Sequence, residues 1–143
     1  MAYYSLLAGQ IKKVNMKKIV TLTCAALLFA MAAFAQASGI DDVINALRSG
    51  NAAQLSKFVD NNIELSLPSK TDNYSRQQAA VILQDFFSNN GVKDFDVKHK
   101  GDNGGNKFCI GTLLTKSGNY RTTFFLAEKN GKQYVKEIRF QQM

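Results

Sequence analysis

Two spacings of apolar residues divide the chain after residue 38. Between Ile40 and Phe87 most apolar side chains recur every three or four positions, whereas from Val92 to the C-terminus they recur every second position. A spacing of three or four places side chains on one side of a helix, and a spacing of two places them on one face of a strand. The pattern therefore predicts helices followed by strands.

The first half of this region predicts two short helices and a strand. Ser38 can cap the first helix and Gly50 can end it. The apolar stripe of this helix consists of Ile40, Val43, Ile44 and Leu47. Asn51 can cap a second, shorter helix. Its apolar side consists of Leu55, Phe58 and Val59. The alternating segment IELSL, residues 63–67, then predicts a strand, which Pro68 ends.

A longer helix is expected to begin after Ser75. Ser75 and Gln78 have the spacing of a capping box, in which each side chain accepts a hydrogen bond from the other residue's backbone. The helix should bury a stripe that consists of Ala79, Ile82, Leu83 and Phe86. Phe87 falls at the edge of this stripe, so we expect Phe86 to be the more deeply buried of the two phenylalanines.

Four antiparallel strands are predicted after this helix, at residues 92–100, 107–116, 120–129 and 133–141. The segments that join them, GDNGGN, SGN and NGK, are rich in tight-turn residues. Gly111 lies inside the second of these strands, where a glycine indicates a bend or a bulge. The order of elements predicts an α+β domain with helices packed on one face of a curved antiparallel sheet.

The first 37 residues follow another pattern. From Met16, two lysines precede an apolar run, residues 19–34, and the small-residue segments AFA and AQA follow. This order is typical of a secretory signal peptide, and the run is short for a membrane anchor. We expect residues 1–37 to be an upstream leader and signal peptide. Residues 38–143 should form one exported domain, periplasmic or secreted, with no membrane span after processing.

The predicted cleavage changes how the charge of the chain is interpreted. The whole chain has a net charge of +7, and residues 1–37 contain four of its lysines and no acidic residue. The remaining 14 basic and 11 acidic residues give a net charge of +3. Nucleic-acid binding then loses its main support. Cys24 should leave with the signal peptide, so the domain would retain only Cys109 and could form no internal disulfide.

The segment INALRSGNAAQLSKFVDNNIELSLPSKTDNYSRQQAAVILQDFF, followed by VKHKG, CIGTL, YRTTFFL and IRF, resembles a family of exported bacterial proteins known as domain of unknown function 4783. The similarity covers Gly39 to Phe140, nearly all of the expected domain. It implies the nuclear transport factor 2-like, or cystatin-like, fold, a cone in which helices pack on a curved sheet. It implies a secreted location as well, but no catalytic residue.

His99 is the candidate acid–base residue. Strict alternation places Phe95, Val97 and His99 on the helix-facing side of their strand, with His99 at its end. A catalytic histidine needs an orienting carboxylate, and the acidic residues of this strand point the other way. Asp85 or Glu64 could approach from other elements, but a rim histidine bonded to backbone or water is the simpler interpretation.

Cys109 is expected to be a small buried hydrophobic residue and not a nucleophile, because nothing in the sequence places a base beside it. One histidine and one cysteine also fall short of the three or four ligands of a zinc site. From these sequence patterns we therefore expect no catalytic residue, no metal site and no cofactor.

Two classes of function stay open. The first is a non-catalytic binding or interaction module for a small apolar ligand or an envelope protein. The sequence is also compatible with a homodimer. The alternative is a small enzyme of the isomerase, dehydratase or hydrolase type that uses His99 in the mouth of the cone. If the domain has a binding pocket, it should lie between the long helix and the sheet, at the open end of the cone, lined by Phe95, Val97, His99, Tyr134, Ile138 and Phe140. These side chains could instead simply fill the core.

Overall fold

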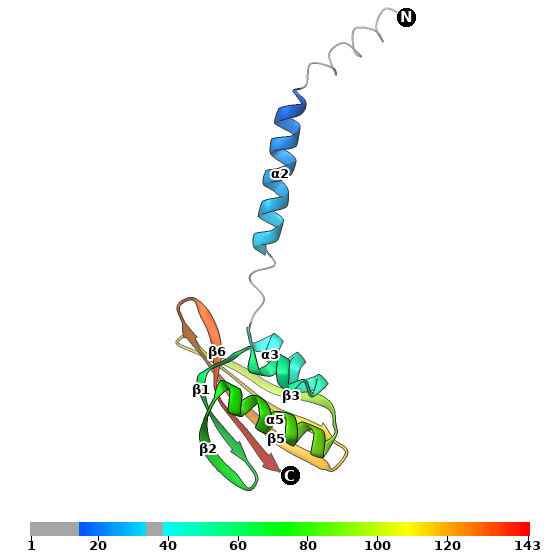
Figure 1. Cartoon of the computed structure of the whole chain (residues 1–143), viewed down its shortest axis with the longest axis vertical. Helices are drawn as coiled ribbons and strands as arrows, with labels where there is room; N and C mark the ends of the chain where they lie inside the picture. The colour runs from blue at the N-terminus through cyan, green and yellow to red at the C-terminus, as the bar shows by residue number, and fades with distance from the viewer. Residues whose placement is uncertain (1–14, 34–38) are drawn as a thin grey trace, which may run out of the picture. The chain divides into compact units, whose positions relative to one another are not determined.

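The computed structural model describes residues 15–33 and 39–143, and the chain divides into two units, residues 1–37 and 38–143 (Figure 1). In the first unit, α2 is a helix over Met16–Ala33. None of the helices in the described ranges is long and apolar enough to span a membrane. The predicted processing of residues 1–37 stays a prediction, and Ser38, the expected first cap, lies outside the described residues.

The helices α3, Gly39–Ser49, and α4, Ala52–Ser56, begin the second unit. The predicted stripe of α3 is buried, and Gly50, with a φ of 62°, ends the helix. Asn51 caps α4 as predicted, because its side chain accepts a hydrogen bond of 2.9 Å from the backbone N–H of Gln54. The second helix is shorter than predicted, because Val59 already belongs to the first strand.

The helix α5, Arg76–Asn90, has the predicted capping box of Ser75 and Gln78 and ends at the left-handed Gly91. Its buried residues are Ala79, Leu83 and Phe87. The predicted order of the two phenylalanines is wrong: Phe87 is 3% exposed, whereas Phe86 is only partly buried. Two adjacent aromatic residues fit either of two neighbouring stripes, and packing against the rest of the fold selects one.

Six strands form one sheet in the order β2-β1-β6-β5-β4-β3. Their bounds are β1 Val59–Leu67, β2 Lys70–Ser75, β3 Val92–Asn103, β4 Asn106–Thr115, β5 Gly118–Lys129 and β6 Lys132–Gln142. Strands β1 and β6 are parallel, and every other neighbouring pair is antiparallel. The predicted four-strand meander is confirmed. The strand β2 was not predicted, because its sequence KTDNYS has no apolar alternation.

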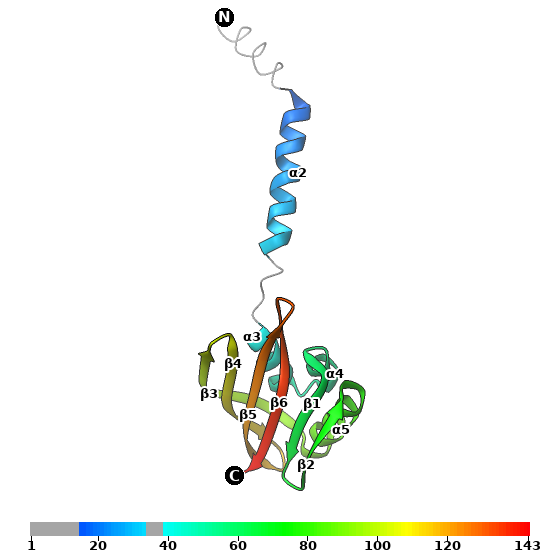
Figure 2. The same ribbon diagram turned by 90° about the vertical axis from the view of Figure 1, so that its left-hand side faces the viewer.

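The sheet has an inner face towards the helices and an outer face away from them. In Figure 1, α3 and α5 lie in front of the strands, and in Figure 2, β5 and β6 face the viewer with the helices behind and beside them. Gly111 marks a bend, as predicted: β3 has a bulge opposite it, between Val97 and His99. A Cβ at Gly111 would lie 2.4 Å from Cζ of Phe95.

The core fills the space between the inner face and the helices. Its largest fully buried side chains are Phe95, Phe124, Phe140, Leu47, Leu55, Ile63, Leu65, Leu83, Leu113, Leu126, Ile138 and Val43. They come from α3, α4, α5 and from five of the six strands. The domain is therefore the predicted α+β architecture, with helices packed on one face of a curved sheet.

Candidate functional site

The structure divides the six residues of the predicted pocket between the two faces of the sheet. Phe95, Ile138 and Phe140 lie on the inner face and are at most 1% exposed, and Val97 packs against the same core. These four side chains occupy the core, as the simpler interpretation required. His99 and Tyr134 lie elsewhere, each because of a bulge.

The predicted placement of His99 on the helix-facing side is wrong. In β3 the bulge inserts Lys98, so Val97 pairs with Gly111 and His99 pairs with Ile110. Beyond the bulge it is Lys100 that reaches the helices, with its Nζ 3.4 Å from Oδ1 of Asp41 in α3. Since neighbouring residues of a strand point to opposite faces, the exposed side chain of His99 lies on the outer face.

The predicted shared face of Tyr134, Ile138 and Phe140 is wrong for the same kind of reason. Val135 pairs with Leu126 and Glu137 pairs with Phe125, so Lys136 is an extra residue in β6. Both Val135 and Ile138 are buried on the inner face. Tyr134 therefore points to the outer face, where it pairs with Ala127 of β5.

Three rings form a continuous line across the outer face, which we call the aromatic ridge: His99 of β3, Phe108 of β4 and Phe125 of β5. The ring centroid of Phe108 lies 5.5 Å from that of His99 and 6.3 Å from that of Phe125. Phe125 is 39% exposed although it is a large apolar residue. The sequence contained the signal for this ridge, since both faces of β4 and β5 carry apolar side chains, but strict alternation misplaced His99.

Gly101 is needed for the position of Phe108. These two residues pair across β3 and β4, and a Cβ at Gly101 would lie 2.2 Å from Cε1 of Phe108. The phenylalanine ring thus lies directly over the glycine backbone. This packing keeps part of the ring out of water while its remaining surface extends the ridge towards His99.

Charged side chains of both signs border the ridge on β6. Glu137 pairs in the sheet register with Phe125, and Arg139 pairs with Thr123. The Nε of Arg139 donates a hydrogen bond to Oε1 of Glu137. The side chain of Glu137 is 21% exposed and that of Arg139 is 50% exposed. The pair therefore contributes little to the free energy of folding. Acidic and basic groups therefore stand two residues apart on one strand of the outer face.

The remaining candidates of the sequence are Cys109, the carboxylates of Asp85 and Glu64, and a metal site. Burial raises the pKa of the Cys109 thiol to about 11, which keeps it protonated near neutral pH and confirms it as a buried hydrophobic residue. Within residues 15–33 and 39–143, neither Asp85 nor Glu64 forms an ion pair with His99. The same ranges contain no cluster of three or more potential metal ligands.

Asp60 is the carboxylate with the most strongly altered titration. Its side chain is 9% exposed, accepts a hydrogen bond from Nζ of Lys136, and has Nζ of Lys129 3.6 Å away. The Lys136 hydrogen bond, helped by that of the Asn61 backbone, lowers the pKa of Asp60 to about 2. This group joins the start of β1 to the bulge of β6, which is a structural role.

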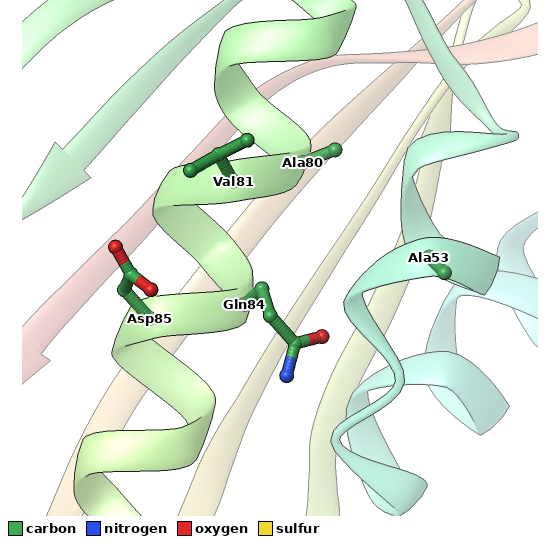
Figure 3. Close-up of a pocket in the computed structure, with 5 residues that line it drawn as sticks. All are labelled: Ala53, Ala80, Val81, Gln84 and Asp85. Atoms are coloured by element: carbon green, nitrogen blue, oxygen red, sulfur yellow. The ribbon is translucent and has the colours of Figure 1, made fainter.

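A shallow hollow of about 300 Å³ lies between α4 and α5, lined by Ala53, Ala80, Val81, Gln84 and Asp85. Figure 3 shows Ala80 and Gln84 directed towards α4, while Val81 and Asp85 lie on the other side of α5. Val81 is 63% exposed and also borders a second hollow, of about 280 Å³. Both hollows are open to solvent, and neither contains a residue of the predicted pocket.

Comparison with solved structures defines the class of protein. An NTF2-like protein of unknown function from Cytophaga hutchinsonii aligns with a TM-score of 0.55 and 11% identity, over 73% of this chain and 87% of that chain. At this identity the likeness shows the fold alone. The domain is thus an NTF2-like fold, as the sequence resemblance implied. No curated protein matches the chain.

The family follows from closer relatives. The family model described as a domain of unknown function, DUF4783, matches residues 40–141. A DUF4783 protein from Bacteroides ovatus is 32% identical over 71% of this chain and 93% of that chain, with a TM-score of 0.69. One from Bacteroides uniformis is 30% identical over 72% and 95%, with a TM-score of 0.70. The chain belongs to the DUF4783 family.

Proposed function

We propose that the protein is an exported, non-catalytic interaction module that binds its partner with the outer face of its sheet. The observation that carries the proposal is the contrast between the two faces. The inner face is occupied by fully buried side chains, whereas the outer face carries the aromatic ridge with Phe125 39% exposed. Exposed apolar groups bordered by polar ones are typical of surfaces that bind other molecules.

The shape of the outer face favours a protein partner over a small apolar ligand. A small ligand is usually enclosed by a concave pocket that covers most of its surface. The ridge instead runs across three neighbouring strands of a sheet. Aromatic side chains on an open surface of this kind are the residues that most often dominate protein interfaces.

The enzyme alternative required His99 in the mouth of the cone beside a carboxylate. His99 lies on the outer face, and its ring neighbours Phe108. A general acid or base also needs its reaction partner within hydrogen-bond distance. The position of His99 therefore suits a binding surface better than acid–base catalysis.

Native mass spectrometry of the protein purified from its own host tests this proposal. The wild type should carry a bound partner, Phe125→Lys should lose it, and Val81→Lys should keep it. Val81 is a matched control, because it is also exposed and apolar but lies on α5. A partner that Phe125→Lys retains, or a wild type that carries none, would overturn the proposal.

The export component has its own test. The lysine, apolar and small-residue order of residues 16–37 supports cleavage before Gln36 or Ser38. N-terminal sequencing of the protein from the cell envelope should find one of these residues first. Finding the apolar run of residues 19–34 still attached would contradict cleavage and favour an anchored protein.

A further inference from the structure

We propose that the turn between β5 and β6 is a site of spontaneous covalent modification, in which Asn130 cyclises onto the backbone nitrogen of Gly131 and is converted to aspartate or isoaspartate. This modification is independent of the proposed function, because it requires no partner. Three Asn–Gly pairs occur in the second unit, at residues 90–91, 103–104 and 130–131. The structure gives each pair a different environment, and only one of these environments favours the reaction.

The reaction needs only the chain and water. The backbone nitrogen of the glycine loses its proton and attacks Cγ of the asparagine side chain. A C–N bond forms to give a cyclic imide, and the side-chain amide nitrogen takes up a proton and leaves as ammonia. Water then opens the imide at either of its two carbonyl carbons, which gives aspartate or isoaspartate. Glycine is the most favourable following residue, because it has no side chain that hinders its nitrogen.

Asn90 is protected because both of its reacting groups are engaged. Its Nδ2 donates a hydrogen bond of 2.7 Å to the backbone oxygen of Phe86, and its Oδ1 accepts one of 2.8 Å from the hydroxyl of Tyr120. The N–H of Gly91 donates a hydrogen bond of 2.9 Å to the backbone oxygen of Phe87. Cyclisation would break these hydrogen bonds at the partly buried end of α5, where water cannot readily replace them.

Asn103 is exposed, but its surroundings oppose the reaction. It is the last residue of β3 and pairs with Asn106, so its backbone is held in the sheet. Asp102 precedes it, and Oε2 of Glu128 lies 3.9 Å from the position of a Cβ at Gly105. Neighbouring carboxylates disfavour the negative charge that develops on the attacking nitrogen. This pair should therefore react more slowly than an exposed pair beside basic groups.

Asn130 and Gly131 are that exposed pair. They form the two-residue turn between Lys129 and Lys132, which pair with each other across β5 and β6, and Figure 2 shows the tip of this hairpin. Both turn residues are exposed. Among the described residues, none other than its chain neighbours lies within 4 Å of a Cβ built at Gly131. Lys132 favours the anionic nitrogen, whereas the charge of Lys129 is shared with Asp60, 3.6 Å from its Nζ.

The two products should affect this turn differently. Asn130 has a φ of 54° and Gly131 has a φ of 76°, and a type I′ turn requires positive φ at both positions. Aspartate, like asparagine, tolerates a positive φ, so it fits the turn. Isoaspartate adds a carbon atom to the backbone and does not fit it. It should loosen the end of the hairpin, where Lys129 contacts Asp60.

Prolonged incubation of the protein, purified as its host produces it, tests the proposal by peptide mapping with mass spectrometry at neutral pH. The peptide that contains Asn130 should gain the mass difference between an amide and a carboxylic acid. A protein isoaspartate methyltransferase should label the isoaspartate form. The rate at Asn90 should be at least about 10-fold lower than at Asn130, because hydrogen bonds must break first. The rate at Asn103 should lie between these two.

A pair of matched variants and an unfolded control show whether the structure selects the site. Asn130→Gly removes the reacting side chain but keeps residues that a type I′ turn accepts, so the mass gain at this turn should disappear. Asn103→Gly makes the same change in the other exposed turn and should leave the reaction of Asn130 unchanged. In guanidinium chloride, where the fold is lost, the three pairs should react at similar rates.

Two results would overturn the proposal. The first is an Asn130 that stays unmodified in the native protein for as long as the unfolded chain needs to react completely. The second is a native rate at Asn90 or Asn103 that equals or exceeds the rate at Asn130, because the environment of the turn would then not select the site.

Discussion

The two faces of the sheet are built on the same strands, yet one is a core and the other is a surface. Phe124 and Phe125 are consecutive residues of β5: the first is fully buried against the helices, and the second is 39% exposed on the outer face. Apolar character alone therefore does not determine burial. The helices cover one face, and on the other face the rings of the aromatic ridge are exposed at His99 and Phe125 and half-buried at Phe108.

The faces also differ in the residues that accompany the aromatic rings. On the inner face the ring of Phe140 packs among apolar side chains, and its centroid lies 6.1 Å from that of Phe87 in α5. On the outer face Phe125 stands beside the charged Glu137. A core excludes unpaired charge, whereas an interface commonly places charged groups at its border. This difference is what identifies the outer face as a candidate interface.

Replacing the two consecutive phenylalanines by alanine should give the largest contrast. Phe124→Ala removes a fully buried ring and should lower the free energy of unfolding by about 3–5 kcal/mol. Phe125→Ala should lower it by less than about 1 kcal/mol in the monomer. Urea denaturation at low protein concentration measures both. Equal losses would show that the outer face also belongs to the folding core.

The helix α5 offers a second pair of adjacent rings. Phe87→Ala should cost about 3 kcal/mol, because Phe87 is 3% exposed, whereas the partly buried Phe86 should cost about 1–2 kcal/mol. Phe86 still contacts Phe140, with ring centroids 4.8 Å apart, so its loss is not negligible. Thermal unfolding of the two variants ranks them, and a larger loss at Phe86 would reverse the helix face described here.

Substitution of two glycines, Gly111 and Gly101, compares how closely side chains are packed on the two faces of the sheet. An alanine at Gly111 would place its Cβ 2.4 Å from the buried ring of Phe95 and 2.7 Å from the backbone oxygen of Asp96. Gly111→Ala should therefore cost about 2 kcal/mol. The three atoms nearest to a Cβ at Gly101 all belong to the ring of Phe108, which is partly exposed and can turn outward. Gly101→Ala should cost less than about 1 kcal/mol in the monomer. Chemical denaturation that finds Gly101→Ala the more harmful would contradict this difference.

The last prediction concerns the buried carboxylate of Asp60. Because its pKa is lowered from 3.8 to about 2, its ionised form stabilises the fold above pH 4, and this contribution is lost as the pH falls from about 4 to 2. Solvent around its half-exposed lysine partners limits the contribution to about 1 kcal/mol. Asp60→Asn should flatten the pH dependence of stability in this range relative to wild type. Parallel curves for the two proteins would assign the pH effect to other groups.

Local signals in the sequence were reliable where a few neighbouring residues decide the structure. Ser75 with Gln78 predicted a capping box, and Asn51 predicted a cap, because both motifs satisfy backbone N–H groups within one turn. Gly111 predicted a bend, because a glycine inside a strand weakens it unless the sheet bends or bulges there. The strand β2 gave no such signal, since its exposed edge position requires no apolar alternation.

At the candidate site, the sequence pattern predicted the wrong sheet face for two residues. Strict alternation assigned His99 and Tyr134 to the inner face, and a single bulge in each strand reversed both assignments. Each bulge adds one residue, Lys98 or Lys136, that no composition rule distinguishes from its neighbours. Because the side-chain period of a strand is two, one added residue moves every later side chain to the other face.

The sequence by itself determined the helices α3, α4 and α5, five of the six strands, the α+β class and the family resemblance, because these depend on spacing and on turn residues close together in the chain. The tertiary structure decided which side of each element became the core. The parallel pairing of β1 with β6 and the two bulges depend on segments up to 76 residues apart, such as Asp60 and Lys136. Within the described residues, α3 and α5 pack on one face of the sheet, so the rings of the aromatic ridge lie exposed or half-buried on the other.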